Sequence, residues 1–522
     1  FACTDAPAKI VLLKLRNVSD RHRRFSVTGY CQWVLGELRS RNAMHVVSQL
    51  DPQTGALFAS NAFNTDAPGW TAFFQCSERD RNLTADRMEF IGPSGSLVSP
   101  AGMRRPALSN RVGAALDPCA AIRAYADVPP GQERWVSFVL GAGDNEQHAR
   151  SLVRSLQTLD SAVQELREVW EFWKRQLGGV YVQTPDESLD YLANHWLLYQ
   201  VLVSRYWGRS GFYQSGGAYG FRDQLQDSLA FLWECPWLTR EHLLRAGSRQ
   251  FPDGDVQGWW HVPSGRGVRT RISDVHLWLP YVASRYVQTT RDTGVLDEKL
   301  AFIEGRPLAD GEDHYYDRPQ NSDKQATLYE HCARAVRHAL RFGRHALPLM
   351  GCGDWNDGMN HVGAAGRGES VWLAFFLLEV LRQFEPVARD RGDEQMADLC
   401  RTQGQDLRNA IEAAAWDGQW YLRAFFDDGS PLGSHRNDEC RIDSISQSWA
   451  VLSQGGSEHR LAQAMESLWQ KLVDTRHGLV RLFAPPFVRS PGLRGAPAKA
   501  NEDHDRTPGE AAANSAAAPN DV

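Results

Sequence analysis

The spacing of apolar residues changes near residue 150, and this change constrains the fold more than any other feature of the sequence. Up to about residue 143 the chain consists of short β-rich runs separated by turn residues, among them residues 10–15, 26–35, 71–76 and 135–140. Over residues 152–177, large apolar residues recur at alternating steps of three and four, which places them on one face of a long helix. The sequence therefore predicts an antiparallel β-sandwich followed by a helical connector.

Helix-like stretches separated by loops rich in Gly, Asp and Trp follow the glycine pair at 178 and 179. These stretches cover residues 189–206, 224–233, 275–290, 326–342, 370–384 and 395–415. Helices that alternate with long polar loops are typical of an α/α barrel, in which the loops at one end line a common cleft. We therefore expect the chemistry of this chain in its loops.

Together these patterns predict a multidomain β + α protein. The expected parts are a β-sandwich domain over residues 1–148, a helical linker over 149–180, and a barrel-type catalytic domain over 181–487. Residues 488–522 contain hardly any large apolar side chain, so they can bury too little surface to offset the entropy lost on ordering. We expect a disordered tail there.

The composition excludes several classes of partner. A formal net charge of -6 over 522 residues leaves no basic surface for nucleic acid or an anionic membrane. The longest mostly apolar runs, residues 196–203 and 373–381, are far shorter than the roughly 18 residues that span a bilayer. Neutral substrates fit better, and 18 tryptophans suit either sugar-binding surfaces or a large aromatic core.

The nine cysteines are scattered and form no CxxC pair, which argues against both a disulfide framework and a thiolate metal site. This pattern predicts a cytoplasmic protein without a bound metal. The sequence begins with Phe1 and shows no charged-then-apolar leader, so we expect the native start to lie upstream and no secretion signal.

The first candidate loop covers residues 213–227 (YQSGGAYGFRDQLQD). In a helix, Asp223 and Asp227 share one face. Arg222 can hold nearby carboxylates ionised, and Arg and Asp together can hydrogen-bond vicinal sugar hydroxyls. The alternative is a structural Arg–Asp network at a helix start.

The second candidate loop covers residues 259–274 and contains His261, Arg266, Arg269 and Arg271. Clustered arginines and backbone N–H groups suit an anion such as phosphate. A solvated basic loop is the plainer interpretation.

The third candidate loop covers residues 351–360 (GCGDWNDGMN), in which Asp354 and Asp357 flank Trp355 and Asn356. If Trp355 stacks on a sugar, a carboxyl held beside its apolar face tends to stay protonated, as a general acid requires. An Asp-rich calcium loop is the alternative, but the EF-hand pattern is not met, so no metal is expected.

Residues 220–227 (GFRDQLQD) and 354–357 (DWND) resemble the two sugar-site motifs of glycoside hydrolase family 94, the inverting β-glycoside phosphorylases that include cellobiose and chitobiose phosphorylases. The chain resembles still more the phosphorylase-like region of cyclic β-1,2-glucan synthetases, through residues 30–36 (YCQWVLG), 328–332 (LYEHC), 366–371 (GRGESV) and 440–449 (CRIDSISQSW). The resemblance runs from about residue 10 to residue 487 and implies an (α/α)6 barrel, incomplete in this chain.

By this resemblance Asp357 is the proton donor, while Arg222, Asp227 and Trp355 surround the glucosyl unit in subsite -1 and Asn356 lies in the same motif. The implied reaction is phosphorolysis of a β-glucan or β-gluco-oligosaccharide, β-1,2-linked, to α-glucose 1-phosphate. One catalytic Asp suffices because phosphate itself attacks the anomeric carbon. Inorganic phosphate is then a co-substrate and no cofactor is needed. A homodimer is one expected assembly, and attachment to the inner membrane is expected only of a longer parent protein.

The chain departs from the family pattern twice. Beyond the point that matches residues 478–487 (GLVRLFAPPF), the family continues into a stretch that supplies a phosphate-binding His, small phosphate donors and an acceptor-site Glu. No such stretch follows here, so we expect a frameshift or premature end, unknown phosphate-binding residues and poor turnover. Residues 273–276 (SDVH) carry Val275 where the family usually has a second Asp.

Two alternatives to a phosphorylase stay open. An inactive remnant would bind glucan without phosphate-dependent turnover. An inverting glycoside hydrolase would need a second carboxylate as the base for water, and Glu369 is the candidate for that role.

Overall fold

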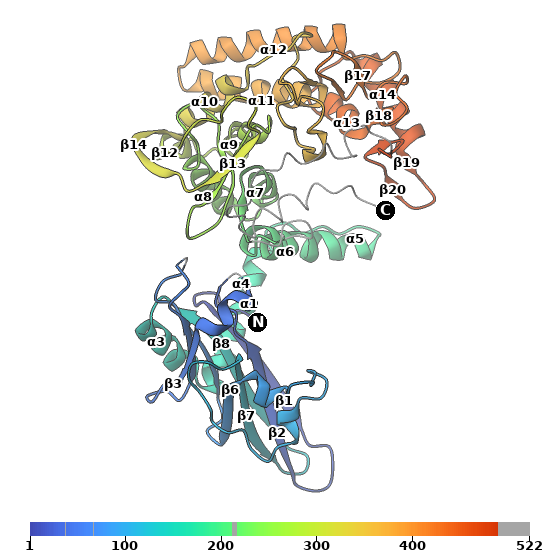
Figure 1. The fold of residues 1–522 in the computed structure, drawn as a ribbon. Coiled ribbons are helices and arrows are strands. Elements are labelled where there is room, and N and C mark those ends of the chain that lie inside the picture. The colour runs from blue at the N-terminus through green and yellow to red at the C-terminus, as the bar shows by residue number, and fades with distance from the viewer. Residues whose placement is uncertain (37, 66, 211–216, 489–522) are drawn as a thin grey trace. The chain divides into compact units, whose positions relative to one another are not determined.

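The computed structural model describes residues 1–36, 38–65, 67–210 and 217–488 (Figure 1). Contacts divide the chain into two compact units, Phe1–Gly178 and Gly179–Val522. The predicted domain bounds at residues 148, 180 and 487 stay predictions. The expected disordered tail lies outside the described residues from 489 onward, as do residues 213–216 of the first candidate loop.

The first unit contains two antiparallel sheets, which confirms the β-sandwich predicted from its short β-rich runs. The five-stranded sheet has the order β1 (Ala8–Arg16), β8 (Glu133–Gly143), β5 (Thr71–Cys76), β4 (Leu57–Asn61), β3 (Val46–Leu50). The three-stranded sheet has the order β2 (Arg23–Gln32), β7 (Pro118–Val128), β6 (Arg81–Asp86). Two short helices, α1 (Arg39–Asn42) and α2 (Arg87–Phe90), lie in the connections.

The central strand β5 is buried on both faces, because successive side chains point to opposite sides of a strand. Phe74 belongs to the core between the two sheets, where it joins Ile122 of β7. Phe73 belongs to a second core, which Val153 of helix α3 (Glu146–Leu156) closes from the other side. Covering both faces explains why this strand is a continuous apolar run rather than an alternating one.

The single long helix predicted over residues 152–177 is wrong: the structure has two helices, α3 (Glu146–Leu156) and α4 (Leu159–Gln176). The chain breaks at Gln157 and restarts because the Thr158 side chain accepts a hydrogen bond from the Ser161 N–H, as a helix N-cap does. The apolar pattern continues through the break because both helices pack against β8 and contribute to one core.

The second unit is mainly helical, as predicted. Its α-helices are α5 (Glu187–Tyr191), α6 (Leu197–Gln200), α7 (Phe221–Ser228), α8 (Pro236–Gly247), α9 (Trp278–Thr290), α10 (Leu328–Ala339), α11 (Val371–Asp390), α12 (Glu394–Ala414), α13 (Ser444–Leu452) and α14 (Glu458–Leu472). Two π-helical segments, Leu192–Trp196 and Val201–Trp207, flank α6. The sequence reading missed α8, α13 and α14.

Small antiparallel sheets lie between these helices and were not predicted. One has the order β13 (His314–Asp317), β11 (Gly267–Thr270), β10 (Gln257–Trp260), β9 (Tyr219–Gly220), and another pairs β12 (Lys299–Glu304) with β14 (Gln320–Thr327). The others join β15 (Glu369–Ser370), β16 (Ala424–Phe425) and β17 (Pro431–Leu432), β18 (Ile442–Asp443) and β21 (Phe483–Ala484), and β19 (Val473–Asp474) and β20 (Leu479–Val480).

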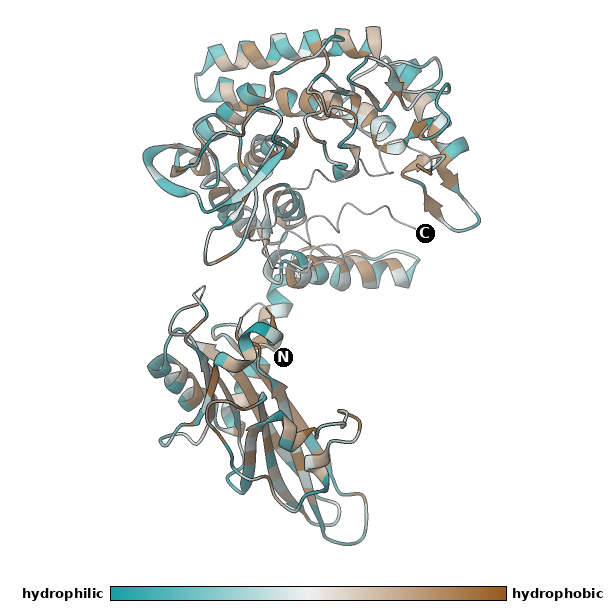
Figure 2. Ribbon diagram, in the orientation of Figure 1, coloured by the Kyte–Doolittle hydropathy of each residue, from teal (hydrophilic) through white to brown (hydrophobic). Residues whose placement is uncertain are grey.

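Helix α11 is the centre of the second unit and contacts α9, α12 and α13. Most of its residues are buried, which is typical of a helix that is apolar on all sides. Helix α12 instead shows alternating hydrophilic and hydrophobic bands along its length (Figure 2). Trp372 and Phe376 of α11 pack against Trp278 of α9 and Trp449 of α13, so part of the tryptophan content is core. No helix among the described residues is long and apolar enough to cross a membrane.

Candidate active site

The two sequence motifs meet in the second unit, although 135 residues separate Arg222 from Asp357. Arg222 Nη2 donates a hydrogen bond to Asp357 Oδ1 at 3.0 Å. The indole Nε1 of Trp355 donates to Gln226 Oε1 at 3.2 Å. The first and third candidate loops therefore contact each other.

Helix α7 positions the first motif. Its N-terminus follows β9, which pairs with β10, and its inward face carries buried Phe221 and Leu225 of the main core. Residues three and four apart lie on one helix face, so burying Phe221 and Leu225 directs Arg222 and Gln226, one residue further on, to the adjacent face.

Asp223 and Asp227 lie on one face, as predicted, and both contact an arginine that sequence reasoning missed. Arg205 Nε donates to Asp227 Oδ2 at 3.0 Å, and Arg205 Nη2 donates to Asp223 Oδ1 at 3.3 Å. Burial raises the pKa of Asp227 to about 6, and the nearby Asp223 adds to this, against the opposing effect of Arg205. Asp227 can accept a hydrogen bond from a sugar hydroxyl with its second oxygen.

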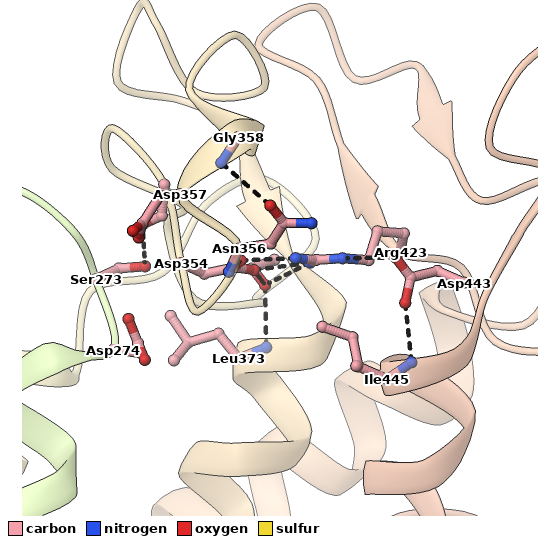
Figure 3. A network of polar contacts seen from close by, with 12 residues as sticks. Ser273, Asp274, Asp354, Asn356, Asp357, Gly358, Leu373, Arg423, Asp443 and Ile445 are labelled. Carbon is pink, nitrogen blue, oxygen red and sulfur yellow. Dashed lines mark hydrogen bonds and ion pairs between the residues drawn. The ribbon is translucent and has the colours of Figure 1, made fainter. Parts of the chain in front are cut away.

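A fully buried ion pair anchors the second motif. The guanidinium of Arg423 donates to both carboxylate oxygens of Asp354, at 2.6 and 2.7 Å, and neither side chain is exposed. Ser370 Oγ donates to Asp354 Oδ2 at 2.6 Å, and the backbone N–H of Asn356 donates to Oδ1 at 3.0 Å. Figure 3 shows Arg423 between Asp354 and Asp443, with Asp357 on the far side of the loop.

Asp443 completes this buried network. Its carboxylate lies 3.3 Å from Arg423 Nε and accepts the backbone N–H of Ile445. Burial raises the pKa of Asp443 to about 6, opposed by Arg423. Burial also acts to raise the pKa of Asp354, but the bidentate Arg423 and the hydrogen bonds outweigh it and hold this pKa below its usual range. Asp354 is thus an ionised anchor.

The structure separates the two carboxylates of the DWND motif. The Asp357 side chain is 64% exposed and lies in the short 3-10 helix Asp357–Met359. Asn356 caps this helix by accepting the Gly358 N–H, and Trp355 is partly exposed. Of the two carboxylates, only Asp357 can contact a substrate.

The segment that precedes α9 packs against the motif loop. Gly351 has a φ of 63°, and a side chain there would meet the carbonyl oxygen of Arg271, so only glycine fits. Ser273 donates to the carbonyl of Gly353 through both its N–H and its hydroxyl. This packing brings the neighbouring Asp274 to Arg222, whose Nη1 lies 3.1 Å from Asp274 Oδ1.

The interpretation of the second loop as an anion site is wrong for Arg269. This residue lies on β11, is almost completely buried, and pairs with Asp255 at 2.7 Å and Asp253 at 3.3 Å. Arg271 donates to the carbonyl of Ala309. The sequence of the segment gave no sign of this pairing, because the acidic partners of Arg269 precede the segment in the chain.

Glu369, the sequence candidate for a hydrolytic base, is buried and already hydrogen-bonded to other groups of the chain. Its carboxylate lies 2.5 Å from His345 Nδ1 and accepts the backbone N–H groups of His345 and Leu347. A base for water must reach solvent and substrate, and the position of Glu369 contradicts that role.

The fold and the sequence of the chain can be compared with those of known proteins. The solved structure of a bacterial glucoamylase complexed with acarbose has a similar fold, with a TM-score of 0.51 and 10% sequence identity over 90% of this chain and 70% of that chain. Residues 172–494 match the catalytic domain of the glycosyl hydrolase 94 superfamily, and residues 1–159 match the glycosyl hydrolase 94 supersandwich domain. The chain belongs to the glycosyl hydrolase 94 family.

Two curated relatives are similar over most of this chain. The cyclic β-(1,2)-glucan synthase NdvB of Rhizobium meliloti (strain 1021) is 44% identical over 92% of this chain, which spans 17% of that protein. The solabiose phosphorylase of Paenibacillus borealis is 28% identical over 94% of this chain, which spans 60% of that protein. The chain thus spans less than two thirds of either relative.

Proposed function

We propose that the second unit catalyses phosphorolysis of β-linked glucosides with inversion, giving α-glucose 1-phosphate. The contact between Arg222 and Asp357 carries this proposal, because it joins the two sugar-site motifs and leaves one exposed carboxylate at their junction. Membership of a family that includes phosphorylases supports it.

The proposed reaction needs one acid. Asp357 donates its proton to the glycosidic oxygen as the C1–O bond breaks, and a phosphate oxygen forms the new bond to C1 from the opposite face. The products are the shortened glucan with a free hydroxyl and α-glucose 1-phosphate. The proton released from phosphate then restores the Asp357 carboxyl, so the step is balanced without a metal or organic cofactor.

The other site residues are proposed to bind the glucosyl unit. Arg222 and Asp227 offer a donor and an acceptor to adjacent hydroxyls, and Trp355 offers an aromatic face to the C–H edge of the ring. Asn356 holds the start of the helix that carries Asp357. The sequence similarity to a cyclic β-(1,2)-glucan synthase supports β-1,2-glucan as the substrate.

The two alternatives differ in their products. An inverting hydrolase would need a second carboxylate poised as a base, and the buried pairing of Glu369 with His345 argues against the candidate for it. A glucan-binding remnant would bind oligosaccharide and release nothing.

The test incubates the purified chain with β-1,2-gluco-oligosaccharides and inorganic phosphate, alongside β-1,3 and β-1,4 isomers. We expect glucose 1-phosphate only with phosphate present, and the most from the β-1,2 series. Release of free glucose would favour the hydrolase, binding without any product would favour the remnant, and equal use of all isomers would contradict the β-1,2 assignment.

The ionisation of Asp227 predicts a pH dependence of substrate binding. Its pKa is raised to about 6, so the carboxylate that accepts a sugar hydroxyl forms as the pH rises through about 6. The KM for oligosaccharide is expected to fall as the pH rises from 5 to 7, a range that spans this pKa. In Asp227→Asn the fall should disappear, whereas in Asp428→Asn, an exposed control, it should persist. A persisting fall in Asp227→Asn would exclude Asp227 as its origin.

A further inference from the structure

Arg222 is shared between two carboxylates with different surroundings. Its Nη2 contacts the exposed Asp357 at 3.0 Å, and its Nη1 contacts Asp274 at 3.1 Å. Asp274 is completely buried and also accepts a hydrogen bond from the indole Nε1 of Trp278 at 2.9 Å. Asp274 therefore cannot contact a substrate.

This arrangement bears on how an acid can work beside an arginine. An opposite charge within about 4–6 Å favours the ionised form of a carboxyl group, whereas a general acid must hold its proton until the transition state. Arg222 alone would draw the proton off Asp357. A second carboxylate on the same guanidinium cancels that positive charge and repels a negative charge on Asp357.

We propose that Asp274 is a positioning residue that neutralises Arg222, so that Asp357 keeps its proton at a higher pH than it could beside an unpaired arginine. This inference rests on the proposed role of Asp357 as the acid. The same pairing holds the guanidinium in place, since Arg222 also donates to the carbonyl of Asp354 at 3.2 Å.

The neighbouring acidic groups contact other arginines than Arg222. Asp354, on the motif loop, is neutralised by Arg423. Asp223, on α7, contacts Arg205 of the π-helical segment Val201–Trp207, as does Asp227. Asp274 is thus the buried carboxylate that faces Arg222 directly. Burial raises the pKa of Asp274 to about 6, against the effect of Arg222, so near neutral pH its carboxylate is mostly charged.

The charges determine the direction in which Asp274→Asn should change the ionisation of Asp357. Asp274→Asn removes one negative charge and leaves a net positive charge on Arg222, which favours ionised Asp357. The titration midpoint of Asp357 should then move to lower pH by about one unit, the lower end of shifts caused by one neighbouring charge. The alkaline limb of the pH–rate profile, which reports loss of the acid, should move the same way.

The test titrates the whole chain labelled with carboxyl-13C aspartate and follows the Asp357 signal by NMR, identified by its absence from Asp357→Asn. Asp443→Asn is the matched control, because Asp443 is equally buried and arginine-paired but faces Arg423. We expect the midpoint to fall in Asp274→Asn and to stay unchanged in Asp443→Asn, with thermal unfolding showing that both variants are folded. If Asp274→Asn does not fold, Trp278→Phe, which keeps Asp274 but removes its indole donor, should shift the midpoint in the same direction by less.

An unchanged or raised midpoint in the folded variant overturns the proposal, and so does an equal shift in Asp443→Asn. The proposed function has a separate test, because full phosphorolysis by the Asp357→Asn variant would contradict it. The titration does not depend on that result, since it needs no turnover.

Discussion

Asp357→Asn is expected to lower kcat for phosphorolysis of a β-1,2-gluco-oligosaccharide by about 10²–10⁴, with little change in KM. The amide has nearly the shape of the carboxyl and can still face Arg222 at its junction with the sugar motifs. It has no proton to give to the leaving oxygen, so the transition state loses stabilisation while the bound substrate does not. Initial rates of glucose 1-phosphate release over a range of oligosaccharide concentrations measure both constants.

Asp428→Asn is the control, since Asp428 is exposed and contacts Ser430 rather than the sugar motifs. Its kcat should equal that of the unchanged chain. A kcat for Asp357→Asn within about twofold of the unchanged chain would remove Asp357 as the acid, because general acids contribute far more than that.

Arg423→Ala is expected to lower the free energy of unfolding by about 3–5 kcal/mol, the cost of leaving a buried charge without its partner. Asp354 and Asp443 would both lose the guanidinium that they share, in a place without solvent. Chemical denaturation of the purified variant measures the change. Because Asp354 holds the motif loop, the remaining folded protein should also turn over more slowly.

Arg306→Ala separates burial from pairing. Arg306 pairs with Glu312 through two contacts of 2.6 Å, as close as those of Arg423, but it is exposed. Surface pairs contribute about 0–1 kcal/mol, so this variant should be nearly as stable as the unchanged chain. Equal losses in both variants would contradict the view that the burial of the Arg423 network makes it an anchor.

Local patterns predicted the elements whose burial they determine directly. The strand predicted over residues 71–76 is β5, and all but the first residue of the stretch predicted over 370–384 lies in α11, because both are apolar runs enclosed by the core. The break between α3 and α4 was not predicted, because it depends on a single side chain, that of Thr158. Pairs such as β9 with β10 and β18 with β21 were not predicted because their strands are only a few residues long and lie far apart in the sequence.

The site was predictable as far as its motifs extend. Arg222, Trp355 and Asp357 lie in two short segments, and the structure brings these segments into contact. Arg423 and Arg205 were missed because their roles depend on ion pairs with residues outside their own sequence segments. Arg423, for example, pairs with Asp354 across 69 residues. The DWND motif alone also could not tell which Asp is buried, since that follows from the position of Arg423.

The role of Asp357 as the acid is tested most directly by comparing two substrates in the Asp357→Asn variant with phosphate present. A β-1,2-linked glucose disaccharide has a poor leaving group that must be protonated, whereas 2,4-dinitrophenyl β-glucoside has a leaving group that departs as a stable anion. We expect the variant to lose about 10²–10⁴ in rate on the disaccharide but to stay within about tenfold of the unchanged chain on the aryl glucoside, because the acid is needed only for the first. Equal losses on both substrates would contradict it.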